Sequence, residues 1–322
     1  MPEKTFRDLL AVLDKKRPVI IQAHDYPDYD ALAAGYSLLY LLGTFGVSGK
    51  LCYSGEAQGF NIQDAVSCLK IPVAPASSLH IDENSQVILV DGFVGNKNVT
   101  SIDGVLTAIV DHHPPPEVVP ACLFTDIRPE IGSCSTIIYQ YYLETITDVP
   151  RDIATALLAG IMLDTGLMTR GVSPADLAAF SGLFFKGDWE EAAYVLRNSF
   201  SLDDIPAIRN TMESYHSYGS VCFVELKKKS RPELLGLVAD LFLRMHEIHF
   251  VVALSLEDTV CRISMRSEAP KLPADLIIRR TLEGQGSGGG HYHMSGGSIP
   301  LEHYRGSEEL RRKILSIIEE YS

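Results

Sequence analysis

Short apolar runs that end in a histidine or an aspartate recur through the first third of the chain. They cover residues 17–23, 86–90 and 105–110 and lead into His24, Asp91 and Asp111, respectively. The runs are rich in valine, isoleucine and leucine, which is typical of strands buried in a parallel sheet. Apolar residues recur with helical spacing at 6–15, before the first run, at 32–42, between the first and second runs, and at 152–163, after the third. The alternation predicts an α/β fold built on an open parallel sheet.

Metal-binding side chains cluster just beyond these predicted strands. Asp111, His112 and His113 follow the third run, and the prolines at 114–116 prevent the strand from continuing. A polar turn after a buried strand is the simpler interpretation of that tripeptide alone. However, parallel strands end at a common sheet edge, where ligand sites form, so Asp91 is expected to lie beside them.

Two further stretches add ligands of the same kind. The loop after the first run carries His24, Asp28 and Asp30, although Asp30 could instead cap the helix that follows. The helix 152–163 runs into Asp164. Aspartate and histidine are the usual ligands for Mn²⁺, Mg²⁺ or Zn²⁺. Because these aspartates and histidines are expected at one edge of the sheet, together they predict a metal site.

The last third of the chain has its own alternation of strands and helices. It predicts strands at 221–226, 249–255 and 260–265 and helices at 233–246 and 274–282. Arg266 follows the third strand, and the last helix leads into a glycine-rich run. Glycines let backbone amides approach a phosphate, and an arginine offers a bidentate fork for one. A flexible connection is the alternative to an anion site, whose residues would be Arg266, Gly288, Gly289, Gly290 and His291.

A chain of 322 residues exceeds one typical core and suggests two domains. We predict a metal-binding domain at 1–190, a linker at 191–214 that contains proline and polar residues, and a smaller α/β domain at 215–322. The linker could let the second domain close over the first, or the two could share a fixed interface.

Charge and composition exclude several classes of protein. The net charge is −13, and all of the acidic surplus lies before residue 215, which argues against wrapping or tracking a long nucleic acid. No apolar run reaches the roughly 18 residues of a membrane helix, and the first residues are too charged for a signal peptide. The six cysteines form no Cys-x-x-Cys pair. We therefore expect a cytoplasmic protein without a membrane anchor.

The motifs together resemble those of the DHH phosphoesterase superfamily. His24-x-x-x-Asp28-x-Asp30, Asp91, Asp111-His112-His113 and the Gly160–Thr165 segment match its four motifs in order, and the glycine run before His291 resembles its DHHA1 domain. The resemblance implies an N-terminal parallel-sheet DHH domain with helices on both faces and a smaller α/β DHHA1 domain. The chain departs from the usual pattern at Tyr29, where a glycine is common, and at Ala33–Ala34, where Gly-Ser is common.

The resemblance also assigns roles to the motif residues. His24, Asp28 and Asp91 would hold one divalent ion, and Asp30, Asp91, His112 and Asp164 the other, so that Asp91 bridges the two. His113 would stay off the metals and act on the scissile phosphate. The oxygen-rich ligand set with two imidazoles favours Mn²⁺ over Zn²⁺. Both ions would be cofactors.

The predicted function is hydrolysis of short nucleotides, in the branch that includes oligoribonucleases and 3′-phosphoadenosine-5′-phosphate (pAp) phosphatases. Cyclic-dinucleotide phosphodiesterase activity is an alternative for the same site, and a non-catalytic nucleotide-binding regulator is an alternative from another class. The complete ligand set argues against the regulator. The Gly288–His291 run argues against a pyrophosphatase. The length of 322 residues argues against a processive exonuclease, which needs further domains to track a long strand. The expected partner is a short nucleotide substrate, and a second copy of the chain is a candidate partner.

Overall fold

The computed structural model describes residues 4–55, 63, 66–93, 99–115, 120–226 and 231–321. Its contacts divide the chain into two compact units, unit 1 at Met1–Asn198 and unit 2 at Ser199–Ser322. The predicted linker, 191–214, spans this boundary. Its first part belongs to a helix whose Ala192, Ala193 and Val195 pack into the core of unit 1. Residues 199–214 of the predicted linker belong to unit 2.

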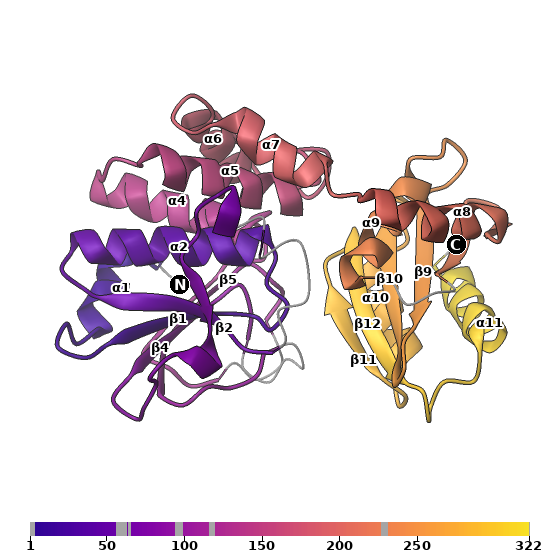
Figure 1. Ribbon diagram of the computed structural model, residues 1–322, viewed down its shortest axis with the longest axis horizontal. Helices are drawn as coiled ribbons and strands as arrows, with labels where there is room; N and C mark the ends of the chain where they lie inside the picture. Colours follow the sequence, from indigo (N-terminus) through magenta and orange to yellow (C-terminus); the bar gives the residue numbers. More distant parts are fainter. Residues whose placement is uncertain are drawn as a thin grey trace. The chain divides into compact units, whose positions relative to one another are not determined.

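Unit 1 is built on a six-stranded sheet in the order β3-β2-β1-β4-β5-β6, and all of its neighbouring strands are parallel (Figure 1). The predicted strands at 17–23, 86–90 and 105–110 are β1, β4 and β5 of this sheet. The strands are β1 (Val19–Ala23), β2 (Gly49–Tyr53), β3 (Val73–Pro75), β4 (Gln86–Val90), β5 (Val105–Asp111) and β6 (Phe124–Ile127). The chain reverses its direction of travel across the sheet between β1 and β4, where open parallel sheets bind ligands.

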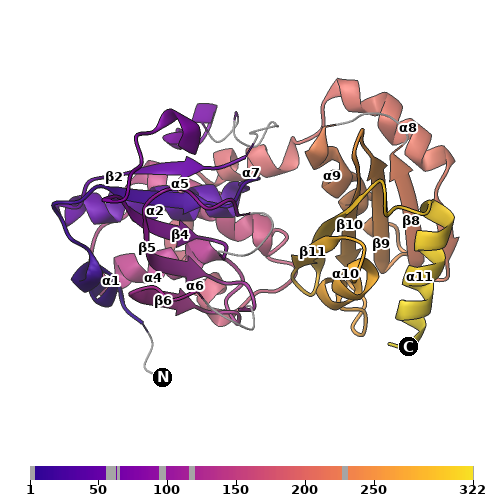
Figure 2. The same ribbon diagram turned by 90° about the horizontal axis from the view of Figure 1, so that it is seen from below.

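The helices of unit 1 share one core with one face of the sheet. That face carries Val19, Ile21, Ile88 and Val90, and Figure 2 shows the helices lying behind the strands. The opposite face, with Leu89 and Ile109, is covered in the described residues by Phe93 and Val99 rather than by a helix. The helices are α1 (Phe6–Val12), α2 (Tyr29–Thr44), α4 (Cys134–Thr145), α5 (Arg151–Asp164), α6 (Pro174–Phe184) and α7 (Trp189–Arg197), with a 3₁₀ turn η1 (Ala76–Ser78).

Unit 2 is smaller and holds a mixed sheet in the order β11-β12-β10-β9-β8-β7. Among the described strands of this unit, β8 and β9 pair in parallel and the other neighbours are antiparallel. Helices α10 and α11 pack on one face and α9 on the other, so this sheet is covered on both sides. The elements are η2 (Leu202–Asp204), α8 (Ile205–Glu213), β7 (His216–Tyr218), β8 (Val221–Leu226), α9 (Pro232–Leu243), β9 (Phe250–Leu256), β10 (Val260–Ser267), α10 (Ala274–Leu282), β11 (Ser287–Gly290), β12 (Met294–Pro300) and α11 (Ser307–Glu319).

The structure confirms the predicted α/β fold class, with a parallel sheet followed by a second, smaller sheet. In the part of the chain that is described, no helix combines the length and the apolar character needed to cross a membrane.

Candidate metal centre

The carboxyl ends of three neighbouring strands bring the candidate ligands of unit 1 together. His24 follows β1, Asp91 follows β4, and Asp111 is the last residue of β5. The backbone N–H of Asp91 donates to the carbonyl of Val110, which fixes the end of β4 against the end of β5. Asp91 has a φ of 59°, a left-handed conformation that is uncommon for a non-glycine residue and costs about 1–3 kcal/mol. Packing at the strand ends holds it there.

Asp91 lies between two groups of ligands. Its Oδ2 atom is 3.9 Å from Nε2 of His24, and its Oδ1 atom is 3.4 Å from Nε2 of His112. Nε2 of His24 is also 4.0 Å from Oδ2 of Asp28. The ligand atoms of His24, Asp28 and Asp91 therefore form one candidate cation group, and those of Asp30, Asp91 and His112 form another.

Asp164, at the end of α5, joins the second group through His112. Its Oδ2 atom is 2.9 Å from Nε2 of His112, and Oδ2 of Asp30 is 3.9 Å from the same nitrogen. Asp91 is thus the carboxylate that these two groups share.

The backbone of α4 holds Asp30 in place. Cys134 N donates to its Oδ2 at 2.6 Å, and Ser135 N donates to its Oδ1 at 2.9 Å. A Cβ atom on Gly160 of α5 would come within 2.7 Å of the same carboxylate, so only glycine leaves room for it there. The alternative in which Asp30 caps its own helix does not hold, because Asp28 is the N-cap of α2. Asp30 instead accepts hydrogen bonds at the start of a different helix.

The crowded carboxylates shift one another's protonation. Burial, followed by the charges of Asp164 and Asp91, raises the pKa of Asp28 to about 6 and raises that of Asp30 well above its usual value. Burial also opposes the charge on Asp91, but the nearby imidazoles of His112, His113 and His24 outweigh it and lower the pKa of Asp91. His112 is buried, yet contact with Asp164 and Asp91 raises its pKa well above the ordinary histidine value.

These residues fit divalent cations. Among the described residues, Oδ1 of Asp164 and Nδ1 of His24 are buried and have no hydrogen-bond partner. Buried carboxylates are stable only when they are paired or coordinate a metal. The donors are carboxylate oxygens and imidazole nitrogens, and the candidate cation groups found among the described residues contain no cysteine. Such a set suits Mn²⁺ or Mg²⁺ better than Zn²⁺.

Asp111 has a role that the sequence did not reveal. It is fully buried, and its Oδ1 atom accepts hydrogen bonds from the backbone N–H groups of His112, at 2.7 Å, and His113, at 3.0 Å. The same oxygen lies 2.8 Å from Nδ1 of His113. Asp111 therefore fixes both the turn after β5 and the ring of His113.

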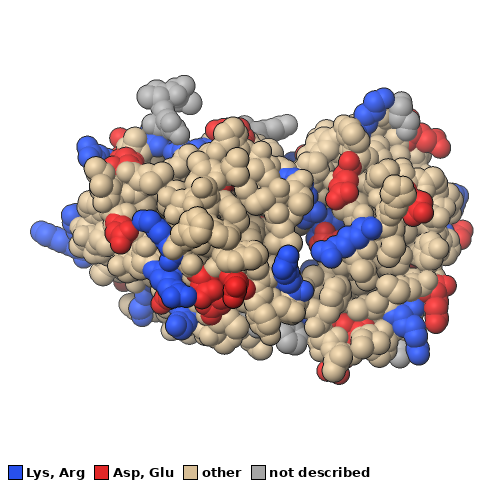
Figure 3. Space-filling model, turned by 90° about the horizontal axis from the view of Figure 1, so that it is seen from above, with Lys and Arg blue, Asp and Glu red and all other residues tan. Residues whose placement is uncertain are grey.

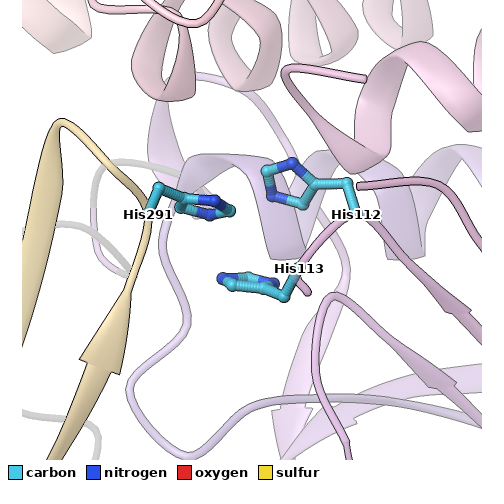
Figure 4. Close-up of side chains that lie close together, drawn as sticks. All are labelled: His112, His113 and His291. Atoms are coloured by element: carbon cyan, nitrogen blue, oxygen red, sulfur yellow. The ribbon is translucent and has the colours of Figure 1, made fainter. Parts of the chain in front are cut away.

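The two histidines of the tripeptide point in different directions (Figure 4). Their rings meet edge to face with centroids 4.7 Å apart. His112 directs Nε2 to Asp91 and Asp164. His113 directs Nδ1 to Asp111, and the same nitrogen lies 3.6 Å from Oδ1 of Asp91, so that Asp91, Asp111 and His113 form a further candidate cation group. Burial opposes the charge on His113, but Asp111 outweighs it and raises its pKa to about 9. That His112 binds metal while His113 acts on the phosphate stays a prediction.

Arg266, predicted to bind a phosphate, is engaged within unit 2. It is 7% exposed, and its Nε atom donates to Oδ1 of Asp240 on α9 at 2.8 Å. Its Nη1 atom donates to Oγ of Ser264 and to the carbonyl of Met265. Asp240 is 26 residues away in sequence, and nothing in the local pattern around Arg266 indicated the pair.

The glycine run expected as a phosphate-cradling loop is an edge strand instead. Gly288, Gly289 and Gly290 belong to β11, which pairs antiparallel with β12. A Cβ atom on Gly288 would come within 2.6 Å of Leu282 on α10, so the bare backbone lets this helix pack closely. His291 directly follows the strand and is labelled in Figure 4. That these residues bind substrate stays a prediction.

The two departures from the family pattern lie in the core. Tyr29 is 4% exposed and packs in the core of unit 1 with Ala33 and Ala34. In unit 1 these side chains are structural, and the tyrosine does not form an exposed wall of the metal centre.

Comparison with known families assigns both units. The description "DHH family, N-terminal domain" matches residues 18–161, and "DHHA1 domain" matches residues 219–321. The two matched ranges contain the strand-end ligands of unit 1 and the whole sheet of unit 2 from β8 onward. Residues 18–161 therefore form a DHH-family N-terminal domain, and residues 219–321 form a DHHA1 domain.

Individual relatives are distant. An uncharacterized protein of Methanocaldococcus jannaschii is 24% identical over 95% of this chain and 65% of its own length. A protein named as a probable manganese-dependent inorganic pyrophosphatase of Streptococcus mutans is 29% identical over 51% of this chain and 56% of its own length. The chain thus spans less than two thirds of either relative.

Two solved structures share the fold. An exopolyphosphatase-related protein from Bacteroides fragilis superposes with a TM-score of 0.76 at 20% identity, covering 95% of this chain and 92% of its own. RecJ from Thermus thermophilus, solved in complex with Mn²⁺, superposes with a TM-score of 0.59 at 14% identity and covers 56% of its own chain.

Proposed function

We propose that the protein is a metal-dependent hydrolase of phosphate esters that acts on short nucleotides with two Mn²⁺ ions. The observation that carries this proposal is Asp91, whose two oxygens face two separate ligand groups on either side of it. A carboxylate shared in this way is what a two-metal phosphoesterase needs. Two relatives support manganese as the metal, because one is named as manganese-dependent and another was solved in complex with Mn²⁺.

The protein's own side chains would divide the work. Two divalent ions bound here would acidify a water molecule and neutralise the phosphate oxygens. Asp91 holds the two ligand groups at a fixed separation, and Asp164 and Asp30 complete the second group with His112. Asp111 keeps the ring of His113 in one orientation, so that His113 can stabilise charge on the phosphate or leaving group.

Pyrophosphate is the second candidate substrate, because curated relatives over half of the chain are named as pyrophosphatases. The Gly288–His291 run, which resembles the DHHA1 signature, argues against a pyrophosphatase and so favours a nucleotide. Cyclic dinucleotides suit the same chemistry.

The test is a parallel assay of the purified protein with Mn²⁺. The substrates are pAp, the linear dinucleotide pApA, RNA of two to five nucleotides, RNA of about twenty nucleotides, cyclic di-AMP, cyclic di-GMP and pyrophosphate. We expect the short linear nucleotides to be cut fastest, and Asp91→Asn to abolish the activity. Cleavage of pyrophosphate alone would replace the nucleotide with the second candidate. Tight nucleotide binding without turnover of any substrate would identify a regulator and overturn the hydrolase.

A further inference from the structure

Asp176, in the first turn of α6, is a buried carboxylate outside the metal centre. Unlike the acidic side chains drawn red on the surface in Figure 3, it is 0% exposed. It belongs to none of the candidate cation groups found among the described residues. A buried carboxylate is costly unless hydrogen bonds or a cation compensate its charge. Its partners therefore indicate what it holds in place.

The carboxylate of Asp176 joins three segments of unit 1. At the start of α6 it completes a capping box with Ser173, whose backbone N–H donates to Oδ2 at 2.8 Å. The backbone N–H of Gly132, 44 residues earlier in the sequence, donates to the same oxygen at 2.8 Å. Oγ1 of Thr136, in the first turn of α4, donates to Oδ1 at 2.6 Å. The contact with Ser173 is local, whereas the other two fix a distant turn and a distant helix.

The turn that contains Gly132 packs closely against the loop between α5 and α6. A Cβ atom on Gly132 would come within 2.6 Å of the carbonyl oxygen of Gly171 and within 2.7 Å of Oδ2 of Asp176. A larger residue at position 132 would push the turn away from both. The bare backbone and the carboxylate of Asp176 therefore set the position of this turn together.

The same turn supplies the hydrogen-bond partner of His112. Nδ1 of His112 lies 3.2 Å from the carbonyl oxygen of Ile131, the residue before Gly132. A carbonyl oxygen can only accept, so the proton of a neutral His112 ring is on Nδ1, and Nε2 is the nitrogen that can bind an ion. Metal-binding histidines usually have such a partner, and its loss typically weakens metal binding about 10–100-fold.

The first turn of α4, which Thr136 joins to Asp176, supplies the partners of a second ligand. Two backbone N–H groups of this turn donate to the carboxylate of Asp30. The segment 131–136 therefore holds both His112 and Asp30, and Asp176 holds the segment near each end. A displacement of this segment would disturb two ligands of the second ion group at once.

We propose that Asp176 is a positioning residue for the second ion group, and that it acts on His112 and Asp30 through the segment 131–136. It touches neither an ion nor the substrate. The inference rests on the proposed function for the presence of two ions, and it adds that the affinity for one of them depends on a carboxylate of α6. The contacts that carry it all lie within unit 1.

Calorimetric titration of the chelator-treated full chain with Mn²⁺ measures this effect. We expect the wild type to bind two ions, and Asp176→Ala to bind one as the wild type does and the other about 10–100-fold more weakly. Electron paramagnetic resonance adds a spectroscopic signature, because two Mn²⁺ ions that share a carboxylate couple magnetically. Below saturation of the weakened site, Asp176→Ala should show the spectrum of isolated Mn²⁺, where the wild type shows that of a coupled pair.

The Asp164→Ala background separates positioning from a general loosening of the fold. Asp164 belongs to the second group through His112, so this variant should keep only the ion of the first group. Adding Asp176→Ala should then leave the affinity for the remaining ion unchanged. A further loss of affinity would show that Asp176 supports the fold as a whole, and would overturn the proposal.

Ser173→Ala is the matched control. It removes the capping box of α6 but leaves the contacts of Asp176 with Gly132 and Thr136. It should lower the melting temperature, as the loss of an N-cap does, and keep both ions at the affinity of the wild type. Asp176→Asn should restore the second ion. Its amide oxygen can accept from Gly132, and its NH₂ group can donate to the hydroxyl of Thr136, which both donates and accepts.

Gly132→Ala keeps the carboxylate and tests the same contact if Asp176→Ala is too unstable to purify. Its Cβ atom must displace the turn from Asp176, so it should weaken binding of the second ion as well. Unchanged affinity for both ions in these two variants would overturn the inference and leave the proposed function intact. A wild type that binds no Mn²⁺ would overturn the proposed function, and this inference with it.

Discussion

Asp91 is the residue on which both candidate ion groups depend, and its substitution is the first test. Asp91→Ala should reduce bound Mn²⁺ from two ions per chain to nearly none, because its two oxygens face different groups. Activity should fall by about 10³-fold or more, given that a single electrostatic contact to a transition state is worth 10²–10³. Metal analysis of the purified variant measures the first effect.

The control for this substitution is Asp103→Ala, which removes an exposed acid from the same unit. It should keep both ions and full activity. Retention of two ions by Asp91→Ala would show that the remaining ligands suffice and that Asp91 does not bridge.

Asp111 and His113 should behave as one functional pair. His113→Ala should retain both ions and lower kcat by roughly 10²–10⁴-fold, as expected for a residue in proton transfer. Asp111→Ala should also lower kcat at constant metal content, because Nδ1 of His113 loses its partner. The double variant should be no slower than His113→Ala alone, since residues that act as a unit are not additive.

The conservative variant Asp111→Asn separates positioning from charge. Its amide oxygen can still accept from the two backbone N–H groups and from His113, so most of the activity should return. Additive losses in the double variant would show instead that Asp111 supports the strand end alone. Loss of one ion from His113→Ala would mean that the roles of His112 and His113 are exchanged.

At the scale of elements, Arg266 joins a helix to a strand. Its ion pair with Asp240 fastens α9 to β10, and a Cβ atom on Gly236 would come within 2.9 Å of its Nη2 atom, so the helix passes close over it. Arg266→Ala should lower the free energy of unfolding of unit 2 by about 2 kcal/mol, the usual loss for hydrogen bonds to a charged group. Chemical denaturation followed by far-UV circular dichroism measures it.

Asp240→Ala is the matched variant for this pair. It should destabilise unit 2 by a similar amount, and the double variant should cost less than the sum. A large rise in KM for nucleotides in Arg266→Ala, without any loss of stability, would restore the phosphate-binding role that the sequence suggested.

At the scale of the whole molecule, the two units have separate hydrophobic cores. Metal should therefore stabilise unit 1 alone. Chelation with EDTA should lower the melting temperature of unit 1, because a ligand at 100 times its dissociation constant contributes about 2.7 kcal/mol, and because crowded carboxylates then repel one another. Trp189 fluorescence reports unit 1 specifically, since the chain has a single tryptophan.

Circular dichroism follows both units and provides the comparison. The unfolding transition of unit 2, followed by circular dichroism, should keep its melting temperature when EDTA removes the metal. If both transitions shift together, the units unfold as one cooperative body and not independently.

The sequence by itself determined the strands that carry the site and most of its ligands. A buried parallel strand needs a continuous apolar run, and parallel strands end at a common edge. His24, Asp91 and the Asp111–His113 tripeptide could therefore be placed together from local pattern alone. The predicted strands at 86–90 and 221–226 and the helix at 274–282 have the observed bounds for the same reason.

Tertiary structure alone decided how the side chains are held and what covers them. The carboxylate of Asp30 accepts a hydrogen bond from the N-terminus of α4, 104 residues later in the sequence. Arg266 on β10 donates to Asp240 on α9, 26 residues earlier. The glycine run became β11 because a bare backbone lets α10 pack against it. Local periodicity reports which side of an element is apolar. It carries no information on which distant element lies there, and that contact sets the orientation of each ligand.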